Sequence, residues 1–214
     1  MKAEGLYVQY GCGWDAPDGW LNFDASPTLR MERISVVGMA LSALMKRNAA
    51  PFPDNVRYGD IVRGLPIAEQ SCRGIYCSHV LEHLSLSDFR IALCNTRTIL
   101  KSGGIFRLVL PDLAFYIREY QGANLPTAAL DFMRSSGLGE QQRNRGIKGL
   151  AREILGNSRH RWMWDYPSIE VELKKAEFMH IRPAAFGDSA EPKFLEVERW
   201  ERWENSLGVE CKRI

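Results

Sequence analysis

The hydrophobic positions of this chain gather in short runs, separated by segments with helical spacing. Strand-like runs cover residues 6–10, 20–23, 56–58, 74–77 and 105–110. Residues 85–100 and 113–120 carry apolar side chains at helical spacing. Strands that alternate with helices predict an α/β fold, in which a mostly parallel sheet is wound on both faces.

The connection between the first two strands is unusually short. Asp24 lies only eleven positions after Gly13, which is too few for a full crossover helix between parallel strands. We therefore expect the first crossover helix to be shortened to a turn. Later in the chain, residues 34–45 predict an apolar helix that forms core, a lid or a homodimer interface, and core is the preferred interpretation.

The amino-acid composition is typical of one ordinary globular domain. The 214 residues are 45% apolar and 25% charged, so we expect a single domain over 1–214, with residues 121–166 as a basic and aromatic cap. A net charge of +2 is too small to indicate a nucleic-acid partner. The longest apolar run is too short to span a bilayer. Five cysteines without a CxxC pair, and no secretory signal, favour a reduced, cytoplasmic protein.

Polar and glycine residues follow the predicted strands. The first strand ends in Gly11-Cys12-Gly13, the second in Asp24, and the third is followed by Asp60 and Ile61. Cys77, Ser78 and His79 close the fourth strand, and Asp112 closes the fifth. Carboxyl ends of parallel strands share one edge of a sheet, where ligands bind. Glycines admit a ligand close to the backbone and a carboxylate can accept both ribose hydroxyls, so the edge suits an adenosine.

The order of these blocks resembles the class I S-adenosylmethionine-dependent methyltransferases, and in particular a bacterial branch of predicted methyltransferases. The resembling segments are residues 11–13, 19–24, 59–61, 79–84, 100–104 and 111–112. The resemblance covers roughly residues 5–120 well and is weaker beyond. It implies the family's Rossmann-like sheet with an antiparallel late strand, and S-adenosyl-L-methionine as cofactor.

The resemblance also implies roles for single residues. Gly11, Cys12 and Gly13 would line the methionine part of the cofactor, and Asp24 would hold the ribose hydroxyls. Asp60 and Ile61 would contact the adenine, whereas Cys77, Ser78 and His79 would border the sulfonium and the methyl group. The chain departs from the family at Gln9, where an acid is usual.

The histidines allow more than one interpretation. His79-x-x-Glu82-His83 fits the H-x-x-E-H pattern of inverted zinc peptidases, but that motif belongs inside a long helix. A divalent ion that holds an acceptor's oxygens is a second hypothesis. The preferred interpretation assigns no metal and lets Glu82 and His83 cap and brace a helix start.

We expect methyl transfer to a small polar or glycan-type acceptor by in-line displacement. His79 and then His160 are the candidate general bases, since imidazole titrates near neutral pH. Asp112 is a further candidate that equally suits a helix N-cap. The alternative function is a non-catalytic binding or assembly domain on the same scaffold. An NAD-dependent oxidoreductase is disfavoured because the chain lacks G-x-G-x-x-G.

Overall fold

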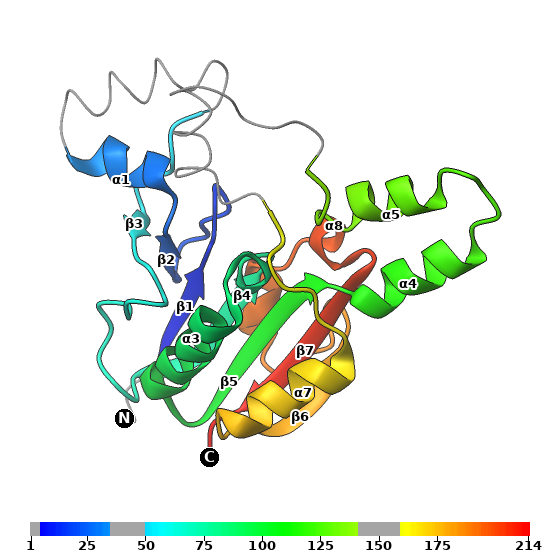
Figure 1. Ribbon diagram of the computed structural model, residues 1–214. Coiled ribbons are helices and arrows are strands. Elements are labelled where there is room, and N and C mark those ends of the chain that lie inside the picture. The colour runs from blue at the N-terminus through cyan, green and yellow to red at the C-terminus, as the bar shows by residue number, and fades with distance from the viewer. Residues whose placement is uncertain (1–4, 35–49, 141–158) are drawn as a thin grey trace.

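The computed structural model describes residues 5–34, 50–140 and 159–214, and within them a seven-stranded sheet. The strand order is β3-β2-β1-β4-β5-β7-β6, with β7 antiparallel to both of its neighbours (Figure 1). This confirms the predicted mostly parallel sheet with one antiparallel late strand. The strands are β1 (Leu6–Tyr10), β2 (Leu21–Asp24), β3 (Val56–Tyr58), β4 (Cys72–Ser78), β5 (Leu100–Pro111), β6 (Met179–Ala184) and β7 (Ser206–Lys212).

The helices begin where the sequence supplies caps. The Ser85 hydroxyl accepts a hydrogen bond from the Asp88 amide, and Asp165 and Ser168 form a reciprocal capping box. The helical elements are α1 (Pro27–Ile34), η1 (Leu81–His83), α3 (Leu86–Ile99), α4 (Leu113–Gly122), α5 (Ala128–Ser135), α7 (Tyr166–Lys175), η2 (Pro192–Glu196) and α8 (Trp200–Trp203). Within the described ranges, no helix is long and apolar enough to cross a membrane.

Helices α3 and α7 cover the face of the sheet that is turned to the viewer in Figure 1. Phe89 and Leu93 of α3 and Ile169 and Leu173 of α7 are fully buried. They belong to one apolar core with the buried side chains of the central strands, among them Phe106. Burying such side chains is the main stabilising term of the fold, at about 1.5–3 kcal/mol each.

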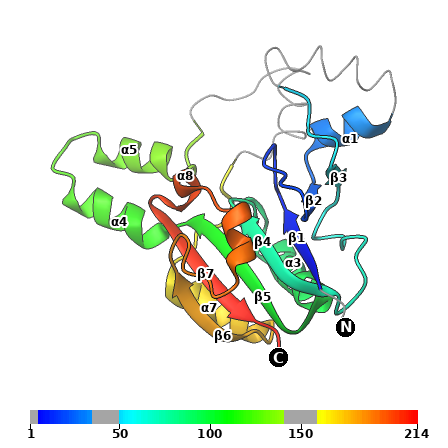
Figure 2. The same ribbon diagram turned by 180° about the vertical axis from the view of Figure 1, so that it is seen from behind.

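The opposite face is covered by an unexpected segment (Figure 2). Residues 11–20 form turns rather than a crossover helix, as the short connection predicts. The segment between β6 and β7 takes that place, because Phe194, Val197 and Trp203 pack with Trp20 and Tyr76 in a second buried cluster. No local pattern in the sequence predicts that residues 192–203 cover this face.

Four features considered from the sequence differ in the structure or lie at least partly outside the residues that it describes. The strand predicted at residues 105–110 begins earlier, because residues 100–104 also belong to β5. Residues 81–83 form a single 3-10 turn, so the long helix that an inverted zinc peptidase needs is missing there. The apolar helix of 34–45 lies outside the described residues except for its first position. Of the predicted cap, residues 121–166, the structure describes two parts. These are residues 121–140, which include α5 and the end of α4, and residues 159–166.

Candidate active site

The glycine loop after β1 lies against the end of β4. Gly11 has φ +69°, and a Cβ at this position would lie 2.0 Å from a Val80 methyl carbon, so only glycine fits. Gly13 also has a positive φ, of +57°, but no described atom lies within 4 Å of its Cβ position. One side of the loop is therefore closed by Val80, and the other side is open at Gly13.

Asp24 ties this loop to the end of β2. Its carboxylate accepts the Gly13 amide at 3.0 Å and the Ser26 amide at 2.7 Å. The Asp24 carbonyl accepts the Gly59 amide, which brings the end of β3 to the same place. A carboxylate oxygen can accept more than one hydrogen bond, so both oxygens keep capacity for a ligand's hydroxyls.

Asp60 and Ile61 follow β3 at the same edge of the sheet. The Asp60 carboxylate accepts the Val62 amide at 2.9 Å and lies 3.5 Å from the Arg63 guanidinium. Ile61 is buried and belongs to the main core. The structure thus brings the three predicted nucleoside-binding segments together at the carboxyl edge.

Gln9 occupies the position where the family usually has an acid. Its side chain is buried and donates to the Asp15 carbonyl at 2.6 Å and to the Asn22 carboxamide at 2.7 Å. The Asn22 amide donates in turn to the Pro17 carbonyl. Both partners of Gln9 are acceptors, so an amide suits this position and a carboxylate would be repelled. Gln9 therefore braces the turns that replace the first crossover helix.

Two cavities differ in place and size. The crevice beside Gly11 holds about 10 Å³ and is lined by Gln9, Tyr76, Ser78, Val197 and Arg202, among others. It has room for about one water molecule. A larger cavity of about 740 Å³ lies at the amino ends of β1 and β4. Ligands of such sheets bind at the carboxyl ends, so we assign the site to the open side of the loop at Gly13.

His79 follows β4 with a left-handed φ of +54°. Its Nε2–H donates to the Arg202 carbonyl at 2.8 Å, and its Nδ1 lies 3.5 Å from Glu82 Oε1. Burial lowers the pKa of this imidazole, but the interactions with Glu82 and with the Arg202 carbonyl raise it more, so the pKa lies above its ordinary value. Both ring nitrogens therefore face groups of the protein itself.

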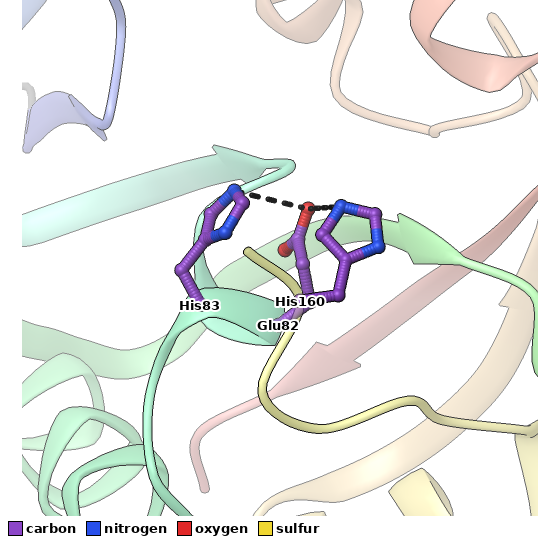
Figure 3. A group of neighbouring side chains, drawn as sticks. All are labelled: Glu82, His83 and His160. Atoms are coloured by element: carbon purple, nitrogen blue, oxygen red, sulfur yellow. Dashed lines mark ion pairs between the residues drawn. The ribbon is translucent and has the colours of Figure 1, made fainter. Parts of the chain in front are cut away.

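His160 and His83 meet at the Glu82 carboxylate (Figure 3). Their Nε2 atoms lie 3.9 Å and 3.8 Å from Glu82 Oε1. Glu82 is fully buried and its side chain caps no helix, contrary to the prediction that it braces a helix start. His160 comes from a segment far along the chain, so the sequence could not show this contact.

Asp112 caps a helix, and Cys12 and Cys77 are buried. Asp112 is the N-cap of α4, because its carboxylate accepts the Ala114 amide at 3.0 Å. Burial, and then the charge of Asp24, raise the pKa of the Cys12 thiol to about 12. Burial also raises the pKa of Cys77 well above its usual value. These two cysteines are therefore neutral and unreactive at physiological pH. Of the five free cysteines, Cys94 alone is exposed.

Comparison with known proteins supports this arrangement. Residues 8–108 match the model of a family described as a methyltransferase domain. A solved methyltransferase from Thermotoga maritima, described as S-adenosylmethionine-dependent and a possible histamine N-methyltransferase, is 16% identical with a TM-score of 0.53, over 100% of this chain and 84% of that one. A second, from Archaeoglobus fulgidus, is 13% identical with a TM-score of 0.49, over 99% and 87%.

At these identities the first structure supports the fold alone, and the second carries no argument. A search of curated protein sequences found no match. The family match contains the glycine loop, Asp24 and the end of β4, and the strand order is that of the same fold. The chain thus carries a methyltransferase domain over residues 8–108 and has the class I methyltransferase fold. It is a methyltransferase, and its cofactor is S-adenosyl-L-methionine.

Proposed function

We propose that the carboxyl edge of β1, β2 and β4 holds S-adenosyl-L-methionine and that its methyl group passes to a small polar or glycan-type acceptor. One observation carries the placement of the cofactor: the Gly13 amide donates to Asp24, which joins the glycine loop to the acid at the end of β2. The cofactor, when bound, supplies a methyl carbon made electrophilic by a sulfonium. The chain needs no covalent intermediate of its own.

Asp24 holds the ribose diol in this proposal. Its oxygens are already oriented by the Gly13 and Ser26 amides, so no side-chain ordering is needed on binding. Gly11, Cys12 and Gly13 shape the wall beside the methionine part, with Val80 behind Gly11. Asp60 and Ile61 border the adenine, and Cys77, Ser78 and His79 close the site at the end of β4.

Rate acceleration comes mainly from alignment. The candidate bases His79, His160 and Asp112 all have protein partners, so the proposal does not assign proton removal to any of them. Holding the acceptor in line with the methyl group and the sulfur removes much of the entropic barrier, and exclusion of water protects the transfer. A neutral Cys12 and a neutral Cys77 do not compete as methyl acceptors.

Calorimetry with S-adenosylhomocysteine tests the ribose assignment. Asp24→Asn replaces one acceptor oxygen by an amide, and we expect the affinity to fall about 10- to 100-fold, since hydrogen bonds to charged groups contribute about 1.5–3 kcal/mol. Asp54→Asn is the matched control, because Asp54 is fully exposed and pairs only with Arg33 at 3.6 Å among the described residues. Equal affinity of the wild type and Asp24→Asn would remove Asp24 from the site.

A further inference from the structure

Glu82 is a buried carboxylate that receives no hydrogen bond from the part of the chain that the structure describes. Its side chain has 0% exposure, and neither oxygen has a hydrogen-bond partner among the described residues. Burying a charge in this state is very unfavourable unless a cation lies beside it. The nearest basic atoms belong to His79, His83 and His160, all at 3.5 Å or more from Glu82 Oε1.

The two outer histidines present lone pairs to this carboxylate. His83 Nδ1–H donates to the Arg159 carbonyl at 2.9 Å, and His160 Nδ1–H donates to the Ser136 carbonyl at 2.6 Å. A carbonyl can only accept, so the proton of each neutral ring sits on Nδ1 and Nε2 is free. Metal-binding histidines show this same arrangement, in which an outer partner sets the tautomer and the ring orientation.

The distances suit a shared ion better than direct contact. The Nε2 atoms lie 3.8 Å and 3.9 Å from Glu82 Oε1, too far for hydrogen bonds. Two donor atoms bound to a tetrahedral zinc ion, each at about 2.0–2.2 Å, lie roughly 3.4 Å apart. The three ligand atoms all lie within 4.8 Å of one another, so each pair must approach by about 0.4–1.4 Å to close the site around an ion.

Backbone contacts hold the three ligands in place. The Glu82 carbonyl accepts the Arg161 amide at 2.7 Å and the Trp162 amide at 3.1 Å, which fixes the segment of His160 against η1. The end of α5 packs on the other side, where a Cβ on Gly137 would lie 2.7 Å from His160 Nδ1. Segments far apart in sequence thus converge on one carboxylate without any ligand present.

We propose that Glu82, His83 and His160 bind one divalent transition-metal ion, with zinc as the best match. Two imidazoles and a carboxylate favour zinc and its neighbours over magnesium, which prefers oxygen ligands. Three protein ligands leave a fourth position for water or a hydroxyl oxygen, as in catalytic zinc sites. His83 and His160 are 17% and 18% exposed, so this position faces the solvent side. The site goes beyond the proposed function and does not depend on it.

Zinc titration of the whole protein tests the site directly. After removal of metal with a chelator, we expect the wild type to bind about one equivalent of Zn²⁺ in competition with a chelating dye. His83→Asn and His160→Asn should each lower the affinity by more than the 10- to 100-fold that loss of an outer-shell partner costs. His180→Asn is the matched control, because His180 is exposed on β6 and outside the cluster. Its affinity should equal that of the wild type.

Equal zinc affinity of the wild type and a folded His83→Asn/His160→Asn double variant would overturn the proposal. Circular dichroism confirms folding, and the wild type alone provides a second test if the variants do not fold. With Co²⁺ as the probe, the proposal predicts visible bands of nitrogen and oxygen ligation. A thiolate charge-transfer band would place the ion at a cysteine such as Cys94 and would overturn the assignment. Neither readout depends on methyl transfer or on cofactor binding.

Discussion

Two fully buried charged side chains have very different surroundings: Arg107 lies on the central strand β5, and Glu82 lies in the turn η1 that follows β4. Arg107 contacts Glu198, and also Asp188 at 2.9 Å and Glu210 at 3.1 Å. Its guanidinium lies over the Trp203 ring, 4.6 Å from the centroid. Glu82, in contrast, faces three imidazole nitrogens at 3.5–3.9 Å and has no hydrogen bond to any residue in the described ranges.

The difference separates a structural charge from a functional one. The Arg107 cluster is complete in the folded chain, because each carboxylate has a donor and the guanidinium has its acceptors. It fastens the segment between β6 and β7 onto the face that lacks a crossover helix. The Glu82 cluster is incomplete, since the free lone pairs of two histidines face a carboxylate. Perturbed or unsatisfied groups of this kind collect at functional sites.

Breaking the complete cluster should have the largest effect. Arg107→Met keeps a long side chain but leaves Glu198 buried without its cation, whereas Glu210 keeps its ion pair with Arg182. We expect a loss of about 3–5 kcal/mol in the free energy of unfolding. The measurement is the shift of the midpoint of urea unfolding, provided that the dependence of the free energy on urea concentration is the same in both proteins. Arg182→Met is the control: Arg182 pairs with Asp188 and Glu210 at 2.8 Å but is partly exposed, so its loss should be smaller. Equal losses would mean that burial is not the cause.

The ion pair between Arg90 of α3 and Glu172 of α7 should make an intermediate contribution to the free energy of unfolding, and this contribution should depend on pH. The side chains of Arg90 and Lys175 lie 2.7 Å from the Glu172 carboxylate, and the Arg90 hydrogen bonds are the main reason that the pKa of Glu172 falls to about 2. A folded pKa below the unfolded value means that the contribution is complete above about pH 5 and is lost as the pH falls toward 2.

Glu172→Gln should therefore cost about 1–2 kcal/mol at pH 7, after allowance for solvent screening of the half-exposed Arg90. Between pH 5 and pH 2 the difference from the wild type should shrink toward zero. Unfolding by urea at several pH values measures this directly. A difference that stays constant over this range would show that the carboxylate charge is not responsible.

Removing the charge of the incomplete cluster should change metal-free stability least. Glu82→Gln keeps the shape and removes a buried charge without hydrogen bonds, so we expect a change of less than about 1 kcal/mol in metal-free protein. Zinc should stabilise the wild type and not the variant, because only a ligand of the folded state shifts unfolding. A metal-free loss as large as that of Arg107→Met would show that the histidines already neutralise Glu82.

Local patterns in the sequence accounted for much of the fold. Apolar runs located the strands, Ser85 and Asp112 marked helix starts, and the eleven-residue gap from Gly13 to Asp24 correctly excluded a crossover helix. The strand predicted at residues 105–110 was too short, because β5 begins at Leu100 and runs through Gly103 and Gly104. The preference of glycine for turns concerns one residue at a time. Whether that residue joins a strand depends on pairing with a neighbouring strand, which the local sequence pattern does not reveal.

The candidate site divides in the same way. The nucleoside-binding residues follow successive strands, and parallel strands must bring their carboxyl ends to one edge, so sequence order alone placed Gly13, Asp24 and Asp60 together. The partners of Glu82 and Arg107 follow no such rule. His160 and Glu198 lie 78 and 91 residues from them in the chain, and their approach depends on how loops pack.

The sequence by itself therefore determined the class of fold, the convergence of the candidate cofactor residues at one edge of the sheet and the missing helix, because these follow from period, length and chain direction. Only the tertiary structure decided that Gln9 braces a turn, that the segment before β7 covers the bare face, and that Glu82 meets three histidines. These outcomes come from contacts between distant segments, and the balance of burial and charge that selects them exists only in the packed molecule.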